Sequence, residues 1–92
     1  MKLPNIGIIG AGHMGSALFQ ALNRAWPRRV YITDRHPKKL RALGAPSQTV
    51  ASLATLITRA DIIILAIKPQ SFDQFCARLP KPLTNKLVIS IL

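Results

Sequence analysis

Short apolar runs alternate along the chain with longer segments in which apolar residues recur every three or four positions. Residues 5–9 form the first run, and residues 13–25 carry their apolar side chains at helical spacing. A continuous apolar run is typical of a strand covered on both faces, whereas the helical spacing indicates a helix with one buried face. The alternation predicts an α/β domain in which helices connect parallel strands.

Five strands joined by helices follow from the same pattern. The right-handed crossover rule then predicts a Rossmann-type doubly wound parallel sheet with the strand order 3-2-1-4-5. Ser52 is the expected N-cap of the helix before the fourth strand. We expect strands at residues 5–9, 29–34, 47–50, 61–67 and 86–92, and helices at 13–25, 37–43, 51–59 and 71–79.

Three glycines with the spacing G-x-G-x-x-G follow the first strand directly. Gly10 permits a tight turn, Gly12 lets a phosphate approach the backbone, and Gly15 lets the next helix pack closely on the sheet. The helix N-terminus offers unpaired N–H groups and a positive dipole end, which suit a pyrophosphate. The spacing alone also occurs in glycine-rich turns of other α/β proteins. The strand before it and the helix after it favour a dinucleotide site.

The second strand ends on Asp34, about twenty residues after the glycine turn, where a ribose-binding carboxylate is expected. A carboxylate there favours NAD and repels the 2′-phosphate of NADP, whereas Arg or Lys attracts that phosphate. Arg35, Lys38 and Lys39 follow Asp34, and His36 is a minor candidate for the phosphate. The residues therefore leave both NAD and NADP open as cofactors.

The first and fourth strands should flank the point where the strand order reverses. Their carboxyl ends carry the loops at residues 10–15 and 66–70, which are the two most distinctive in the chain. Ligands of doubly wound sheets bind in the crevice at this point. We therefore expect the dinucleotide to lie across both loops.

Composition narrows the class of protein. Ninety-two residues with 49% hydrophobic content make a single domain, at residues 1–92. The one cysteine, Cys76, excludes an intrachain disulfide and a multi-cysteine metal site, which fits a reducing, cytoplasmic compartment. No apolar stretch is long enough to cross a membrane.

The formal net charge is +10, but the basic residues are dense only at 35–41 and no nucleic-acid-binding module is visible, so nucleic acid is a disfavoured partner.

No catalytic set is visible in the chain. A hydride transfer requires a cofactor and a group that positions or protonates the substrate. The sequence offers neither a buried acid–base pair nor a nucleophile beside its base. We interpret His13 as a wall residue rather than a general acid, and Lys68 as a cofactor-contacting or loop-shaping residue rather than a proton donor. No catalytic residue and no metal ligand is predicted.

Residues 8–17 (IIGAGHMGSA) and 60–70 (ADIIILAIKPQ) together resemble the N-terminal domain of pyrroline-5-carboxylate reductase, and the resemblance runs through essentially the whole chain. Many dehydrogenases share the first motif, but the A-x-K-P-Q loop is more selective. The resemblance implies an NAD(P)H-dependent oxidoreductase of proline biosynthesis, which reduces 1-pyrroline-5-carboxylate to L-proline. It implies cofactor-binding residues at Ile9, Gly10, Ala11, Gly12, His13, Met14, Gly15, Asp34, Arg35, Ala66, Ile67, Lys68 and Pro69.

The chain departs from this family in two places. The family commonly has an asparagine near residues 51–53, where this chain reads Ala-Ser-Leu, so Ser52 replaces that contact or the contact is absent. The family's helical second domain, which forms the dimer and completes the substrate site, has no counterpart in the 92 residues. We therefore expect a cofactor-binding fragment that is inactive alone and exposes apolar surface. Substrate binding and homo-oligomer formation would belong to a longer protein.

Other interpretations stay open. The chain could be the cofactor domain of a prephenate, β-hydroxyacid or F420-type dehydrogenase, although the K-P-Q sequence disfavours these. A non-catalytic nucleotide-sensing module would bind the cofactor without needing a substrate domain.

Overall fold

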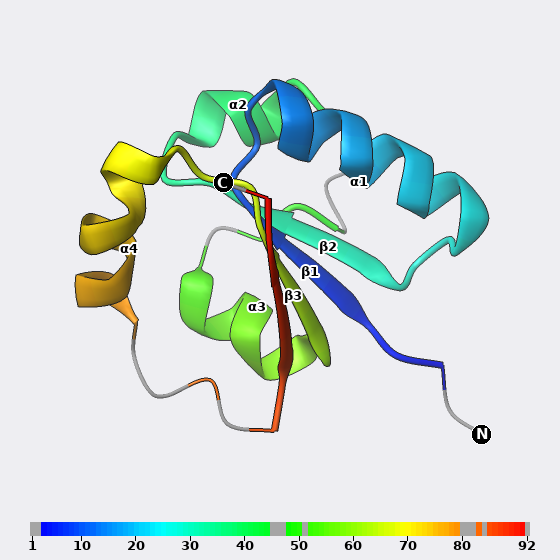
Figure 1. Ribbon diagram of the computed structural model, residues 1–92. Coiled ribbons are helices and arrows are strands. Elements are labelled where there is room, and N and C mark those ends of the chain that lie inside the picture. Colours follow the sequence, from blue (N-terminus) through cyan, green and yellow to red (C-terminus); the bar gives the residue numbers. More distant parts are fainter. Residues whose placement is uncertain (1–2, 45–47, 51, 80–82, 84, 92) are drawn as a thin grey trace.

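The computed structural model describes residues 3–44, 48–50, 52–79, 83 and 85–91. Within these residues, four parallel strands form one sheet in the order β2-β1-β3-β4 (Figure 1). Ile6 of β1 is aligned with Val30 of β2 on one side and with Ile62 of β3 on the other. The strand order therefore reverses between β1 and β3. The strands are β1 (Ile6–Ile9), β2 (Val30–Thr33), β3 (Ile62–Leu65) and β4 (Leu87–Ser90).

Helices cover both faces of the sheet (Figure 1). On one face, Phe19 of α1 and Leu40 of α2 pack with Ile8 and Ile32 in one apolar core. On the other face, the buried residues of α3 and α4 pack with Ile63 in a second core. The two-sided covering explains why the inner strands are continuously apolar. The helices are α1 (His13–Ala25), α2 (Pro37–Arg41), α3 (Leu53–Arg59) and α4 (Phe72–Arg78), and α4 is preceded by the 3-10 turn η1 (Pro69–Ser71).

The predicted fold class is confirmed, with one difference at the third predicted strand. There Thr49 forms only an isolated parallel bridge with Ile32, on the outer side of β2. The bridge consists of bonds from Ile32 N–H to Gln48 O at 3.0 Å and from Val50 N–H to Ile32 O at 2.8 Å. Shortly after this bridge, Ser52 caps α3 with its hydroxyl, as the sequence predicts.

The bounds of the other elements are close to those predicted. The run at 61–67 is strand only over Ile62–Leu65, because the chain then turns into the loop that leads to η1. Ser47, Ala51 and Leu92, which belong to predicted elements, lie outside the described residues.

Gly7 of β1 allows α3 to approach the sheet closely. A Cβ at Gly7 would lie 2.7 Å from Leu56 Cδ2 and 2.8 Å from the Cβ of Ala60. Both contacts are far shorter than ordinary carbon–carbon separations. The distance between β1 and α3 is therefore set by the lack of a side chain at this position.

The strand β4 lies at one edge of the described sheet and is exposed along its whole length. Leu87 is 58% exposed, Val88 39% and Ile89 42%, although their sequence is that of an interior strand. This strand is the largest departure from the burial that the apolar pattern predicts.

Candidate functional site

Two of the three glycines in the turn between β1 and α1 are required by internal packing. Gly10 has a φ of 113°, a conformation that favours glycine, and a Cβ there would lie 2.5 Å from the Ala66 carbonyl oxygen. A Cβ on Gly15 would lie 1.8 Å from the Gly10 carbonyl oxygen. A side chain fits at neither position, so the fold itself demands these glycines.

Gly12 has no such internal reason to be a glycine. It is the N-cap of α1 with φ −75°, a value that any residue adopts, and a Cβ there would meet no atom within 4 Å. The first turn of α1 contains no acidic residue, and no side chain caps its N–H groups. The open space, the free N–H groups and the positive end of the helix dipole together fit a phosphate group at Gly12.

Asp34, at the end of β2, joins the β2 loop to the glycine turn. Its Oδ2 accepts the Ala11 N–H at 2.7 Å, and its Oδ1 accepts the His36 N–H at 2.7 Å and lies 3.1 Å from His36 Nδ1. The Asp34 side chain is only 9% exposed. Both carboxylate oxygens therefore already have donors from the protein.

These contacts also set the acidity of Asp34. Burial raises the pKa of the carboxyl, but hydrogen bonds from the Ala11 and His36 amides and from the His36 ring lower it. The positive charge of Lys39 acts in the same direction, and the net pKa lies below its ordinary value. Asp34 is thus held as an ionised carboxylate.

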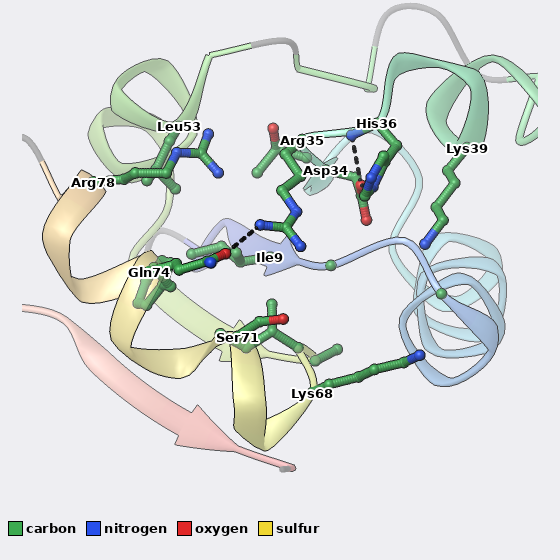
Figure 2. A pocket seen from close by; sticks show the side chains of 16 residues that line it. Ile9, Asp34, Arg35, His36, Lys39, Leu53, Lys68, Ser71, Gln74 and Arg78 are labelled. Atoms are coloured by element: carbon green, nitrogen blue, oxygen red, sulfur yellow. Dashed lines mark hydrogen bonds and ion pairs between the residues drawn. The ribbon is translucent and has the colours of Figure 1, made fainter.

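A cavity of about 200 Å³, called the slot below, lies at the carboxyl ends of β1, β2 and β3 (Figure 2). It brings together the two loops that the sequence singles out. Of the predicted cofactor-binding residues, the slot is lined by Ile9, Gly10, Gly12, Asp34, Arg35, Ala66, Ile67 and Lys68. The other predicted residues belong to the same two loops but do not line it: Ala11, His13, Met14, Gly15 and Pro69.

Positive charge dominates the slot. Its lining includes Arg35, Lys39, Lys68 and Arg78, whereas Asp34 is the one acidic side chain among the lining residues. Because the Ala11 and His36 N–H groups donate to the Asp34 carboxylate, the protein itself partly offsets its negative charge. This excess of positive charge suits an anionic ligand.

One wall of the slot was not predicted from the sequence. Ser71, Gln74, Phe75 and Arg78 line it, and their spacing puts them on one face of α4 and the turn before it. This i, i+3, i+4, i+7 spacing was present in the sequence. Without the packing of Phe75 into the core, however, nothing indicated which helix face the slot would meet.

The described residues hold no group of three or more His, Cys, Asp or Glu side chains that could bind a metal ion. His13 is exposed at the start of α1, and Cys76 is exposed on α4. Nor does the described part of the chain contain a helix with the length and apolar character needed to span a membrane.

The doubly wound sheet, the glycine turn and the cationic slot at the reversal of strand order define a Rossmann-like domain, the class of α/β domain that binds dinucleotides. Within that class, the chain belongs to the family described as NADP oxidoreductase, coenzyme F420-dependent, whose sequence model matches residues 5–92.

The relatives confirm the resemblance to pyrroline-5-carboxylate reductases. The enzyme of that name from Methanosarcina acetivorans is 38% identical over 97 residues, which cover 99% of this chain and 36% of the relative. The structure of Plasmodium falciparum pyrroline carboxylate reductase with NADP bound has a TM-score of 0.77 and 27% identity, and the match covers 99% of this chain and 34% of that one.

An imine reductase from Pseudomonas sp. is similar in fold. Its TM-score is 0.80 at 23% identity, over 98% of this chain and 32% of the imine reductase. The present chain thus spans about a third of the length of the proteins it matches.

Proposed function

We propose that the chain is the NAD(P)-binding domain of a reductase that converts 1-pyrroline-5-carboxylate to L-proline. The observation that carries the proposal is Gly12, a glycine that neither the backbone conformation nor the packing of this protein requires. A phosphate bound close to the backbone explains why position 12 is a glycine, since a side chain there would keep the phosphate away. The similarity to pyrroline-5-carboxylate reductases along 99% of the chain supports the choice of substrate.

In this proposal the predicted cofactor-binding residues form three groups, one for each part of the dinucleotide. We assign Ile9, Gly10, Ala11, Gly12, His13 and Met14 to the pyrophosphate, Asp34 and Arg35 to the adenosine end, and Ala66, Ile67, Lys68 and Pro69 to the nicotinamide end. Gly15 supports the pyrophosphate site by letting the helix start close to the glycine turn. The reduced nicotinamide supplies a hydride to the carbon of a C=N bond when bound. These residues of the chain bind and orient it, and we expect no turnover by the 92-residue chain alone.

We propose NADP(H) as the preferred cofactor. Asp34 at this position would ordinarily indicate NAD. Here, however, the Ala11 and His36 amides already donate to the Asp34 carboxylate, and the cationic side chains of Arg35 and Lys39 line the slot beside it. Cationic side chains there favour a 2′-phosphate over a ribose hydroxyl.

Calorimetric titration of the chain with NADPH and NADH at matched ionic strength tests this proposal. We expect both to bind, NADPH more tightly. Gly12→Ala should weaken both affinities by about tenfold or more, equivalent to about 1.4 kcal/mol. The thermal unfolding midpoint should fall by only a few degrees, because the added methyl group meets no protein atom and only the modest N-cap preference for glycine over alanine is lost. Absence of binding to the folded wild-type chain would contradict the proposal.

The family description favours a second candidate, an F420-type oxidoreductase. Coenzyme F420 would then be the electron donor or acceptor that works with NADP. Titration of the NADPH-loaded chain with F420, followed by the fluorescence of the deazaflavin, separates the two candidates. Saturable binding of F420 would favour this second candidate over 1-pyrroline-5-carboxylate reduction.

A further inference from the structure

The face of α4 toward the slot is held firmly in place. Phe75 is buried in the core on that face of the sheet, with 7% of its surface exposed. Gln74 precedes it, and Arg78 lies one turn further along the helix. Because Phe75 anchors the helix, Gln74 and Arg78 reach the slot from a fixed backbone (Figure 2).

Arg35 spans the slot from the opposite wall. Its Nη1 donates a hydrogen bond to Gln74 Oε1 at 2.6 Å, and this bond joins the β2 loop to α4 (Figure 2). No carboxylate among the described residues forms an ion pair with Arg35, since the one acid of the slot, Asp34, pairs with His36. The guanidinium is thus oriented by a neutral oxygen.

Because the acceptor on Gln74 is neutral, it orients the Arg35 guanidinium without offsetting its positive charge. The guanidinium has five N–H donors in one plane, so a single bond to Gln74 fixes the plane and leaves other donors and both faces free. A glutamate at position 74 would orient the group equally well but would cancel its charge. A long side chain that is already held also loses less conformational entropy when it binds an anion.

We propose that Gln74 is a positioning residue that holds the Arg35 guanidinium across the adenosine end of the slot, and so sets the preference for a dinucleotide that carries a 2′-phosphate. The inference rests on the proposed dinucleotide binding. Gln74 acts through Arg35 and need not touch the cofactor itself.

The test compares NADPH and NADH affinities by calorimetry in the wild-type chain and in Gln74→Leu. Leucine keeps the helix and the approximate side-chain length but removes the acceptor. The NADPH affinity should fall about three- to tenfold, the size of one ordinary net hydrogen bond because this bond is exposed to solvent, while the NADH affinity changes less than about twofold. Gln20→Leu, an exposed glutamine on α1 that does not line the slot, is the matched control.

Gln74→Glu separates orientation from charge. It keeps an acceptor for Arg35 but adds a negative charge to the slot, so the ratio of NADPH to NADH affinity should fall further than in Gln74→Leu. Circular dichroism establishes that each variant is folded.

The outcomes distinguish the two proposals. If the folded wild-type chain binds neither dinucleotide, the proposed function fails. If it binds both but Gln74→Leu behaves like Gln20→Leu, the positioning role is wrong while dinucleotide binding stands. Tighter NADPH binding by Gln74→Leu would also overturn the positioning role, since the hydrogen bond would then be a barrier to the cofactor.

Discussion

Gly15 illustrates how one residue can serve the fold at a site where ligand binding is expected. Its missing side chain lets the start of α1 touch the backbone of Gly10, where a Cβ would lie 1.8 Å from the carbonyl oxygen. Gly15→Ala should therefore force the helix away from the turn and destabilise the chain by about 3 kcal/mol or more. Urea unfolding followed by circular dichroism measures this loss. A stability within about 0.5 kcal/mol of the wild type would contradict the packing described.

Asp34 links the protonation state of the site to the stability of the fold. The pKa of its carboxyl is lower in the folded chain than in the unfolded chain, so the folded state binds fewer protons as the pH falls. The stabilisation is fully present above the unfolded pKa of about 4 and is lost below it. Urea titrations at neutral pH and near pH 3 should therefore show an acid-induced loss of stability.

Asp34→Asn should reduce this acid-induced loss and also lower the stability at neutral pH. The amide cannot offer two charged oxygens to Ala11 and His36. Asp73→Asn, at an exposed position in the first turn of α4, is the matched control and should leave most of the acid-induced loss in place. Equal pH profiles for the two variants would show that Asp34 is not the group responsible.

At the scale of elements, β1 and α3 are packed so closely that there is no room for an added methyl group between them. Gly7→Ala would place a methyl group 2.7 Å from Leu56 Cδ2, and the helix must shift to admit it, at a cost of about 1–3 kcal/mol. Leu56→Ala leaves a cavity and also destabilises, by about 2–5 kcal/mol. In the double variant the contact of the new methyl group with Leu56 is relieved and only its contact with Ala60 remains. We expect its unfolding free energy to exceed the additive value, and a double-mutant cycle measures that coupling.

At the scale of the whole molecule, the exposed edge strand β4 is the element through which we expect the chain to self-associate. An apolar strand with an open edge is a template for pairing with another chain, although the net charge of +10 opposes close approach of two copies. We expect sedimentation velocity to show concentration-dependent self-association that increases with salt. Ile89→Lys should suppress it, whereas Thr58→Lys, an exposed substitution on α3 with the same added charge, should not. A monomer at every concentration and salt level would contradict this expectation.

The sequence by itself determined the helices, four of the five predicted strands, their order and the position of the glycine turn. These features depend on local chemistry: apolar periodicity, the backbone freedom of Gly10, and the capping hydroxyl of Ser52. The sequence also identified Asp34 and Arg35 as candidates for the adenosine end. Each of these inferences requires only residues that are close together in the chain.

Only the tertiary structure decided how those residues are used. The engagement of Asp34 by Ala11 joins groups 23 residues apart, and the bond between Arg35 and Gln74 joins groups 39 residues apart. The packing of Gly7 against Leu56 likewise depends on how α3 sits on the sheet. The rotation of each helix, fixed by the burial of residues such as Phe75, determines which side chains reach the slot. Periodicity finds the buried face of a helix, but the partner across a cavity depends on distances that the linear order of residues does not contain.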